Sequence, residues 1–266
     1  MVMDTLFLKL GGSLLTDKTG IEAVRPAVLA RVAKEIAAAR AAQAQPRLVL
    51  GHGSGSFGHV PAAEHGTRQG VQTAAQWRGF ADVSASARRL NARVTESLLA
   101  AGVTAVSLPP SAAARCVDGE IVAYAAEPVQ RALDAGMVPI VFGDVAFDRL
   151  RGGTIVSTEE VLAALVPLLE PLWLLLAGET PGVLDGDGQL VPQITPRNFE
   201  QIAPALGGSR GTDVTGGMAA KVAAMLRLTV EHPGLRVRIL SGLEPGLLRE
   251  ALLAPADGAG TVIEAG

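Results

Sequence analysis

Residues 48–59 read LVLGHGSGSFGH, a short apolar run that passes directly into a glycine-rich loop. The apolar run predicts a buried strand, and the loop glycines allow backbone N–H groups to turn toward an anion at close range. Two further glycine turns each add a lysine: KLGGS at residues 9–13 closes an apolar run, and TGGMAAK at residues 215–221 opens a helical stretch. Such turns at strand ends and helix starts predict phosphate binding, and we expect a phosphoryl-transfer enzyme.

Short aliphatic runs alternate with stretches of helical period along the chain. The runs lie at residues 6–10, 48–50, 104–108, 138–142, 172–177, 236–240 and 261–263. The helical stretches include residues 26–42, 81–101, 127–135, 161–169 and 217–231. This alternation predicts an α/β protein, a three-layer α/β/α sandwich around a mainly parallel sheet of about eight strands. The turn signals Asp118-Gly119 and Gly152-Gly153 predict hairpins that interrupt the alternation. We find no repeat and no linker, and we expect a single domain over residues 1–266.

Composition is that of a globular protein and argues against several classes of function. Of the 266 residues, 48% are hydrophobic and 18% charged, and a net charge of −3 with scattered basic residues argues against a nucleic-acid partner. The start of the chain lacks the basic region and the small-residue cleavage site of a signal peptide, so we expect a cytoplasmic location. The apolar segment 161–178 is divided by Pro167, Glu170 and Pro171, which argues against a membrane span. The single cysteine, Cys116, excludes an internal disulfide.

Other interpretations of the glycine loops fit less well. Residues 53–58 match the glycine pattern of dinucleotide-binding proteins, but the acidic residue expected about twenty positions later is absent. A P-loop needs a lysine and a hydroxyl directly after its last glycine, and neither follows the loop at residues 53–58. The histidines His52, His59 and His65 lack the spacing of a zinc site, so we expect no metal-ligating residue.

Together, the motifs resemble those of the amino acid kinase superfamily and, within it, the isopentenyl phosphate kinases. The resemblance extends over almost the whole chain and rests on residues 9–13, 16–18, 53–59, 143–148 and 212–218 with Lys221. The Ser-Phe-Gly-His element at residues 56–59 is its specific part. This element is typical of kinases whose acceptor is itself a phosphate or a phosphonate.

The resemblance implies transfer of the γ-phosphoryl group of ATP to isopentenyl phosphate, giving isopentenyl diphosphate in a variant mevalonate route, with Mg²⁺ bridging the nucleotide phosphates. It also implies a homodimer, an acceptor-binding half at residues 1–156 and a nucleotide-binding half at residues 157–266. A phosphate monoester has a second pKa of about 6 and is largely dianionic near neutral pH, so the acceptor needs no general base. The site must instead supply positioning and positive charge.

The resemblance also assigns roles to individual residues. Lys9 would stabilise the transferring group, Lys221 would hold the β/γ end of ATP, and Lys18 would cover the nucleotide phosphates. His59 would hold the acceptor phosphate and Glu159 would orient the lysines, so the expected catalytic residues are Lys9, His59, Glu159 and Lys221. The nucleotide is expected at Gly11, Gly12, Ser13, Lys18, Gly178, Gly182, Gly216, Gly217 and Lys221. The acceptor is expected at Gly53, Ser54, Gly55, Gly58, His59, Val83, Gly143 and Asp144, with Val83 in a stretch of small and apolar residues suited to a prenyl tail.

Two segments depart from the pattern of the family. Relatives carry Ser-Gly-Asp-Asp where residues 157–160 read STEE, so Glu159 falls on the aspartate that orients the lysines. The same segment also has the pattern of a capping box. Residues 178–183 read GETPGV and lack the aspartates of the relatives. Two alternatives stay open: a kinase of another small phosphate or phosphonate such as fosfomycin, and a weakly active nucleotide-binding relative.

Overall fold

An eight-stranded sheet forms the centre of the protein, for which the computed structural model describes residues 4–17, 19–42, 47–58, 66–207 and 217–266. Its strands, in spatial order, are β10 (Gln193–Ile194), β12 (Thr261–Ile263), β11 (Arg236–Ser241), β9 (Trp173–Gly178), β1 (Thr5–Leu10), β2 (Arg47–His52), β6 (Val138–Phe142) and β3 (Ala105–Ser107). Neighbouring strands run parallel from β11 to β3, whereas β12 pairs antiparallel with β11 and parallel with β10. The predicted sheet is therefore confirmed.

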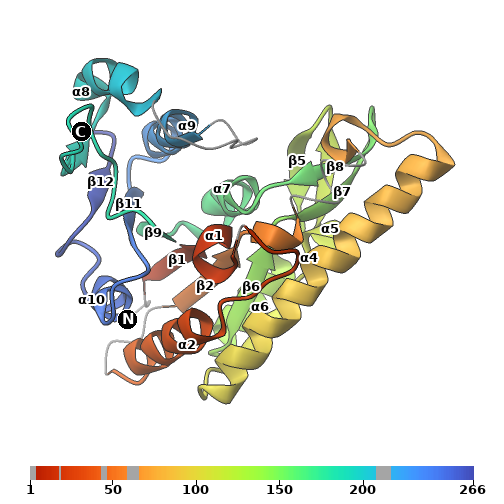
Figure 1. The fold of residues 1–266 in the computed structure, drawn as a ribbon, viewed down its shortest axis with the longest axis horizontal. Helices are drawn as coiled ribbons and strands as arrows, with labels where there is room; N and C mark the ends of the chain where they lie inside the picture. Colours follow the sequence, from red (N-terminus) through yellow and green to blue (C-terminus); the bar gives the residue numbers. More distant parts are fainter. Residues whose placement is uncertain (1–3, 18, 43–46, 59–65, 208–216) are drawn as a thin grey trace.

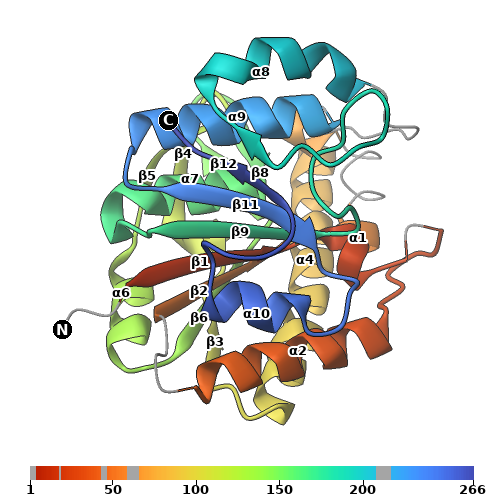
Figure 2. The same ribbon diagram turned by 90° about the vertical axis from the view of Figure 1, so that its left-hand side faces the viewer.

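Helices cover both faces of this sheet (Figure 1). The helices α2 (Pro26–Arg40), α4 (Ala74–Ala100) and α10 (Leu247–Leu253) pack on one face, and α6 (Glu127–Asp134), α7 (Thr158–Leu169) and α9 (Gly217–Glu231) pack on the other. Figure 2 shows α2 and α10 below the sheet and α7 and α9 above it. Shorter helical segments are α1 (Gly12–Leu15), α5 (Pro110–Ala113), α8 (Pro196–Ile202), η1 (Gly55–Phe57), η2 (Thr67–Gln69) and η3 (Ala203–Gly207). The arrangement is the expected three-layer sandwich.

The alternation of side chains along β1 decides which face of the sheet receives its lysine. Leu6, Leu8 and Leu10 belong to the core beneath α2 and α10, whereas Phe7 belongs to the core beneath α7 and α9. Successive residues of a strand point to opposite faces, so Lys9 lies on the side of Phe7. Every residue of β1 is buried, and Lys9 therefore needs a partner on α7 or α9.

A second, four-stranded sheet lies beside the N-terminal end of α4 (Figure 1). Its strands, in order, are β5 (Glu120–Tyr124), β4 (Ala114–Val117), β7 (Asp144–Asp148) and β8 (Gly152–Val156). The antiparallel pairs β4 with β5 and β7 with β8 confirm the predicted hairpins. The parallel pairing of β4 with β7, which joins the hairpins into one sheet, was not predicted.

Capping residues explain why two helices begin earlier than predicted. The hydroxyl of Thr73 accepts from the backbone N–H of Gln76, and the Gln76 side chain accepts from the N–H of Thr73, so α4 begins at residue 74 and not at 81. The same reciprocal bonds join Ser157 and Glu160 at the start of α7. The predicted capping box is thus confirmed, and it places Glu159 in the first turn of a helix.

Asp148 fastens the turns of both hairpins of the small sheet. Its carboxylate accepts backbone N–H bonds from Asp118, Gly119, Leu150 and Arg151. Burial alone would raise the pKa of Asp148, but these four bonds outweigh it and hold the pKa below 3.8. Asp148→Asn is therefore expected to lower the free energy of unfolding at pH 7 by about 2–3 kcal/mol, because the amide loses charge-assisted bonds.

The pH dependence of stability tests this role of Asp148. Because the folded pKa is lower than the unfolded one, the stabilisation is complete above the unfolded value of about 3.9 and is lost as the pH falls through the folded value. Urea unfolding of both proteins at pH 7 and pH 3 is expected to show a smaller difference at pH 3. An equal difference at both pH values would mean that the ionised carboxylate contributes nothing.

Candidate active site

The first two glycine turns lie against each other at the ends of β1 and β2. The N–H of Gly53 donates to the carbonyl of Leu10 over 3.0 Å. A Cβ atom on Gly12 would lie 2.4 Å from the backbone nitrogen of Gly55, and one on Gly55, whose φ is +50°, would lie 2.1 Å from the hydroxyl oxygen of Thr16. Only glycine allows this approach. The two turns therefore meet at the carboxyl ends of β1 and β2.

Two lysines from distant parts of the chain share one carboxylate beside these turns. The Nζ atom of Lys9, on β1, lies 2.7 Å from Oε1 of Glu159, on α7. The Nζ atom of Lys221, on α9, lies 3.9 Å from the same oxygen. The side chains are 10%, 23% and 35% exposed for Lys9, Glu159 and Lys221, so the cluster is shielded but reachable from solvent. Three of the four expected catalytic residues therefore lie together.

The environment of Glu159 keeps its carboxylate ionised. Burial alone would raise its pKa, but the charges of Lys9 and Lys221 and the hydrogen bond from Lys9 hold the pKa below the usual 4.5. The position in the first turn of α7 also favours a negative charge, because the N-terminus of a helix is the positive end of its dipole. Glutamate therefore reaches both lysines from the position at which the resemblance leads us to expect aspartate.

The expected acceptor residues after β6 lie at the end of the sheet beside β2. The N–H of Gly143 donates to the carbonyl of His52 over 3.3 Å. Asp144 is only 1% exposed, and its carboxylate accepts from the backbone N–H groups of Val145 and Ser111 over 2.8 and 3.4 Å. These contacts fit a residue that shapes the turn from β6 into β7 rather than one that touches an anion.

Val83 lies in a small apolar cluster at the junction of α4 with the four-stranded sheet. The cluster contains the buried residues Val71, Phe80, Val83 and Val145, with Ile155 packed against it. Its members come from α4, β7, β8 and the segment after η2. Val83 is itself a predicted acceptor residue, and Val145 directly follows another, Asp144. The use of this cluster by a substrate stays a prediction.

The expected nucleotide residues at the end of β9 and just after it begin beside the glycine turn of β1. The N–H of Gly11 donates to the carbonyl of Ala177 over 2.8 Å, which places Gly178 next to that turn. A Cβ atom on Gly182 would lie 2.7 Å from the hydroxyl oxygen of Thr261, so this glycine is required where the loop crosses β12. The loop thus begins beside the glycine turn of β1 and extends to β12.

The remaining predicted residues are distributed as follows. Ser13 lies in α1, Gly58 directly follows η1, and Gly217 opens α9 with a φ of +69°. Three residues lie outside the part of the chain that the structure describes: Lys18, His59 and Gly216. Their roles stay predictions.

Two contacts beside the site were not predicted. Arg25 and Glu179 form an ion pair over 3.0 Å across 154 positions of the chain. The hydroxyl of Thr158 donates to the carbonyl of His52 over 2.7 Å across 106 positions. No local spacing signals such pairs, although the loss of aspartates around Glu179 did mark its loop as unusual.

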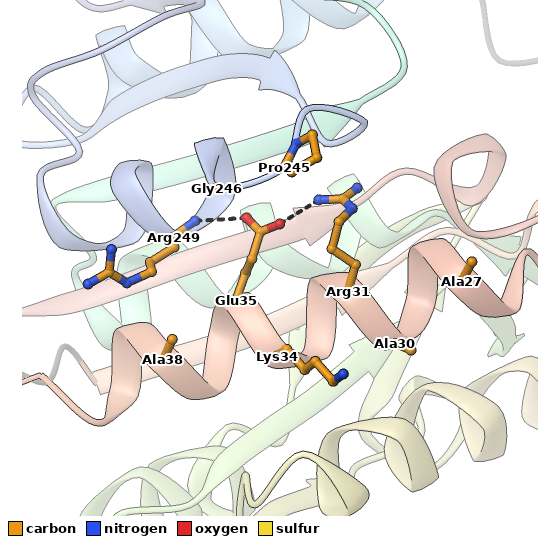
Figure 3. Close-up of a pocket in the computed structure, with 9 residues that line it drawn as sticks. All are labelled: Ala27, Ala30, Arg31, Lys34, Glu35, Ala38, Pro245, Gly246 and Arg249. Carbon is orange, nitrogen blue, oxygen red and sulfur yellow. Dashed lines mark hydrogen bonds and ion pairs between the residues drawn. The ribbon is translucent and has the colours of Figure 1, made fainter.

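A hollow lies between α2 and the start of α10 (Figure 3). The helices α2 and α10 cover the face of the sheet opposite to Lys9. Arg31 and Glu35 pair within the hollow over 2.5 Å, and the Glu35 carboxylate also accepts from the backbone N–H of Arg249 over 3.2 Å. Arg31 donates further to the carbonyl of Gly242, just after β11. These bonds tie α2 to α10 and to the end of β11, so we assign the hollow a structural role.

Comparison with known proteins agrees with this geometry. The model of the amino acid kinase family matches residues 4–241 of the chain. The chain belongs to the amino acid kinase family. As a member of a kinase family, the protein is a phosphotransferase, and the family expected from the motifs is confirmed.

Curated relatives of the chain include isopentenyl phosphate kinases. The chain is 42% identical over 229 residues to the isopentenyl phosphate kinase of Haloferax volcanii, covering 85% of this chain and 89% of that protein. It is 33% identical over 263 residues to the isopentenyl phosphate kinase of Methanothermobacter thermautotrophicus, covering 93% and 95%. A solved structure titled "X-ray structures of isopentenyl phosphate kinase" superposes with a TM-score of 0.81 at 29% identity, covering 97% of this chain and 100% of that one.

Proposed function

We propose that this phosphotransferase transfers the γ-phosphoryl group of ATP to isopentenyl phosphate, giving isopentenyl diphosphate and ADP. The observation that carries the proposal is the lysine pair on Glu159, placed beside the meeting point of the glycine turns of β1 and β2. The names of the relatives from Haloferax volcanii and Methanothermobacter thermautotrophicus support the choice of acceptor.

The chemistry requires little more than charge and position. A phosphate oxygen of the acceptor attacks the γ-phosphorus, and the bond from that phosphorus to the bridging oxygen breaks, so ADP leaves with the electron pair. The acceptor is largely dianionic near neutral pH, because its second pKa is about 6, and no side chain has to remove a proton. The obstacle is the repulsion between two anions, which Lys9 and Lys221 offset with positive charge.

The residues present suit a magnesium nucleotide. Lys9 and Lys221 share the single negative charge of Glu159, so the cluster keeps a net positive charge that suits polyphosphate. We expect Mg²⁺ to be held by nucleotide phosphates and water, its usual ligands in kinase sites. Among the described residues, no group of three or more His, Cys, Asp or Glu side chains is arranged to hold a metal ion by itself.

The apolar cluster around Val83 supports a prenyl tail on the acceptor. Its buried side chains belong to α4, the small sheet and the segment after η2, and Gly143, in the turn from β6 into β7, donates to the carbonyl of His52 at the end of β2. A tail in contact with these side chains would leave the phosphate on the side of the glycine turns. Burial of a five-carbon chain is worth about 3–4 kcal/mol at roughly 0.8 kcal/mol for each methylene, enough to distinguish a prenyl phosphate from a polar acceptor.

A coupled assay of ADP formation tests the function directly. The acceptors are isopentenyl phosphate, fosfomycin and glutamate at equal concentration, with ³¹P NMR to identify the product. We expect kcat/KM for isopentenyl phosphate to exceed the values for the other acceptors by at least about a hundredfold. Turnover with glutamate alone would contradict the proposal.

Several expectations about the protein stay predictions. In the part of the chain that the structure describes, no helix combines the length and apolarity that crossing a membrane requires. The cytoplasmic location, the homodimer, and the division into an acceptor half and a nucleotide half are proposals of the same standing. So are the roles of Lys18 on the nucleotide and His59 on the acceptor phosphate.

A further inference from the structure

A chain of polar side chains, with His52 and Asn91 buried and Ser107 half-buried, leads to the acceptor loop. His52, the last residue of β2, is fully buried and stacks on Phe142 with ring centroids 5.4 Å apart and planes 6° apart. Its Nε2 atom lies 3.0 Å from the side-chain nitrogen of Asn91, which is 4% exposed, and the Asn91 carbonyl oxygen accepts from the hydroxyl of Ser107. Polar groups at such depth destabilise a fold unless every one is hydrogen-bonded, and apolar side chains would fill the same space.

This chain of hydrogen-bonded side chains ends at the backbone of the glycine loop. Its last hydrogen bond decides which atoms along it donate and which accept. The Nδ1 atom of His52 lies 3.2 Å from the carbonyl oxygen of Gly53, which can only accept, so Nδ1 must carry the proton. Burial lowers the pKa of His52 to about 4, with a smaller contribution from the charge of Lys9, so the ring is neutral near pH 7 and Nε2 accepts. Asn91 must then present its NH₂ group to His52 and its oxygen to Ser107.

The orientation of the Gly53 carbonyl also fixes that of the N–H of Ser54. The described residues contain no cis peptide bond, so the N–H of Ser54 lies in the same peptide plane as the carbonyl of Gly53 and points in the opposite direction. That carbonyl is turned inward to the His52 ring, and the N–H of Ser54 is therefore turned away from the core. Among the described residues it has no hydrogen-bond acceptor, whereas the N–H of Gly53 is bound to Leu10. Ser54 is only half-buried, so an outside acceptor can reach this donor.

The preceding peptide is held as firmly. The carbonyl of His52 accepts from the hydroxyl of Thr158 over 2.7 Å and from the N–H of Gly143 over 3.3 Å. With the N–H of Gly53 bound to Leu10, three neighbouring elements hold this peptide. Among the described residues, the His52 ring is the one group bonded to the peptide between Gly53 and Ser54.

We propose that His52, Asn91 and Ser107 are positioning residues that hold the Gly53 carbonyl inward and thereby present the N–H of Ser54 to the acceptor phosphate. The proposal rests on the proposed function for the identity of the acceptor. The three side chains touch no reacting atom. They act through the backbone, because the donor that they orient is the backbone N–H of Ser54. Almost every residue has such a group, so a sequence alone does not mark this one.

Two substitutions at His52 separate positioning from packing. His52→Asn places an amide nitrogen near the site of Nδ1 and can still donate to Gly53. His52→Gln places its amide near the site of Nε2, next to Asn91, and leaves the Gly53 carbonyl without its donor. Both remove the ring that stacks on Phe142, so the midpoint temperature of thermal unfolding should fall by a similar amount in the two variants.

Kinetics of these variants decide the matter. We expect His52→Gln to raise KM for isopentenyl phosphate by about tenfold, the effect of one hydrogen bond to a charged group, with KM for ATP unchanged within about twofold. His52→Asn is expected to stay within about threefold of the wild type. His232→Gln, at the end of α9, is the matched control. Equal KM values for the acceptor in His52→Asn and His52→Gln would overturn the proposal.

A second measurement is independent of turnover. Long-range ¹H–¹⁵N NMR of protein labelled with ¹⁵N at histidine reports which ring nitrogen carries the proton, and we expect Nδ1–H at His52. Nε2–H would overturn the positioning role whatever the kinetics show. If the wild type shows Nδ1–H but does not phosphorylate isopentenyl phosphate, the proposed function fails and the assignment of the Ser54 amide to that acceptor is overturned with it.

Discussion

Replacing Lys9 by methionine is expected to lower turnover by about 10²–10³-fold, the usual effect of losing one group that stabilises transition-state charge. Methionine keeps most of the apolar stem in a position that is 8% exposed, and removes only the charge. That charge matters most while the phosphoryl group lies between its partners, so kcat should change more than KM for the acceptor. Steady-state kinetics at saturating ATP measure both.

The matched control is Lys34→Met, the same change at an exposed lysine of α2 on the opposite face of the sheet. It is expected to leave turnover within about twofold of the wild type. Thermal unfolding of both variants is needed as well, because Lys9→Met removes the closer counter-charge of Glu159. Normal turnover in a folded Lys9→Met protein would remove Lys9 from the chemistry.

The first turn of α7 connects the two sides of the proposed reaction. Glu159 holds Lys9 and Lys221, and the adjacent Thr158 holds the carbonyl of His52 at the start of the acceptor loop. Ser157 and Glu160 fix this turn with a capping box. The same helix turn thus holds both the lysines and the acceptor loop in position. This suits a reaction that depends on the alignment of its groups.

The central sheet could be predicted because its signals are local. Apolar runs marked its main strands, the glycine turns marked where β1 and β2 end, and Asp118-Gly119 marked a hairpin. The joining of the hairpins into a second sheet could not be predicted, because the pairing of β4 with β7 depends on how β6 leaves the central sheet. The two-residue strand β10 and the seven-residue helix α10 are too short for a clear period.

The site also contains residues that could be predicted from the sequence and residues that could not. Lys9 and Lys221 follow from their glycine turns, and Glu159 follows from the resemblance to known kinases even though aspartate was expected there. The chain from Ser107 through Asn91 to His52 could not be predicted, because its members lie on β3, α4 and β2 with no common spacing. The sequence suggested only that His52 was not a zinc ligand. Buried polar networks depend on tertiary packing, which a single sequence does not reveal.

Glu159→Gln is expected to lower turnover by at least about tenfold, equivalent to roughly 1.4 kcal/mol of transition-state stabilisation. Glutamine keeps the size of the side chain and can still accept from Lys9, but it carries no charge. Lys9 and Lys221 then lose the carboxylate that lies 2.7 and 3.9 Å from their Nζ atoms. Loss of the charge that both lysines share strengthens the repulsion between them, and the more exposed Lys221 is expected to move away from the phosphates.

Glu160→Gln is the matched control, since it makes the same chemical change one residue along the same helix turn. Glutamine also serves at this position of a capping box, so α7 keeps its start. The variant loses the charge paired with Arg68 at the surface, which is worth about 0–1 kcal/mol in stability and nothing in the chemistry. Turnover of Glu160→Gln is therefore expected within about twofold of the wild type.

Glu159→Asp then shows how much the additional methylene of glutamate matters. If the backbone of α7 stays in place, the shorter side chain withdraws its oxygens by about 1.5 Å, and Lys9 is held through water or not at all. Turnover is expected between the values of the wild type and Glu159→Gln, because the charge is kept and only its position changes. Wild-type turnover in Glu159→Gln, with Glu160→Gln equally active, would mean that another group organises the lysines at this site.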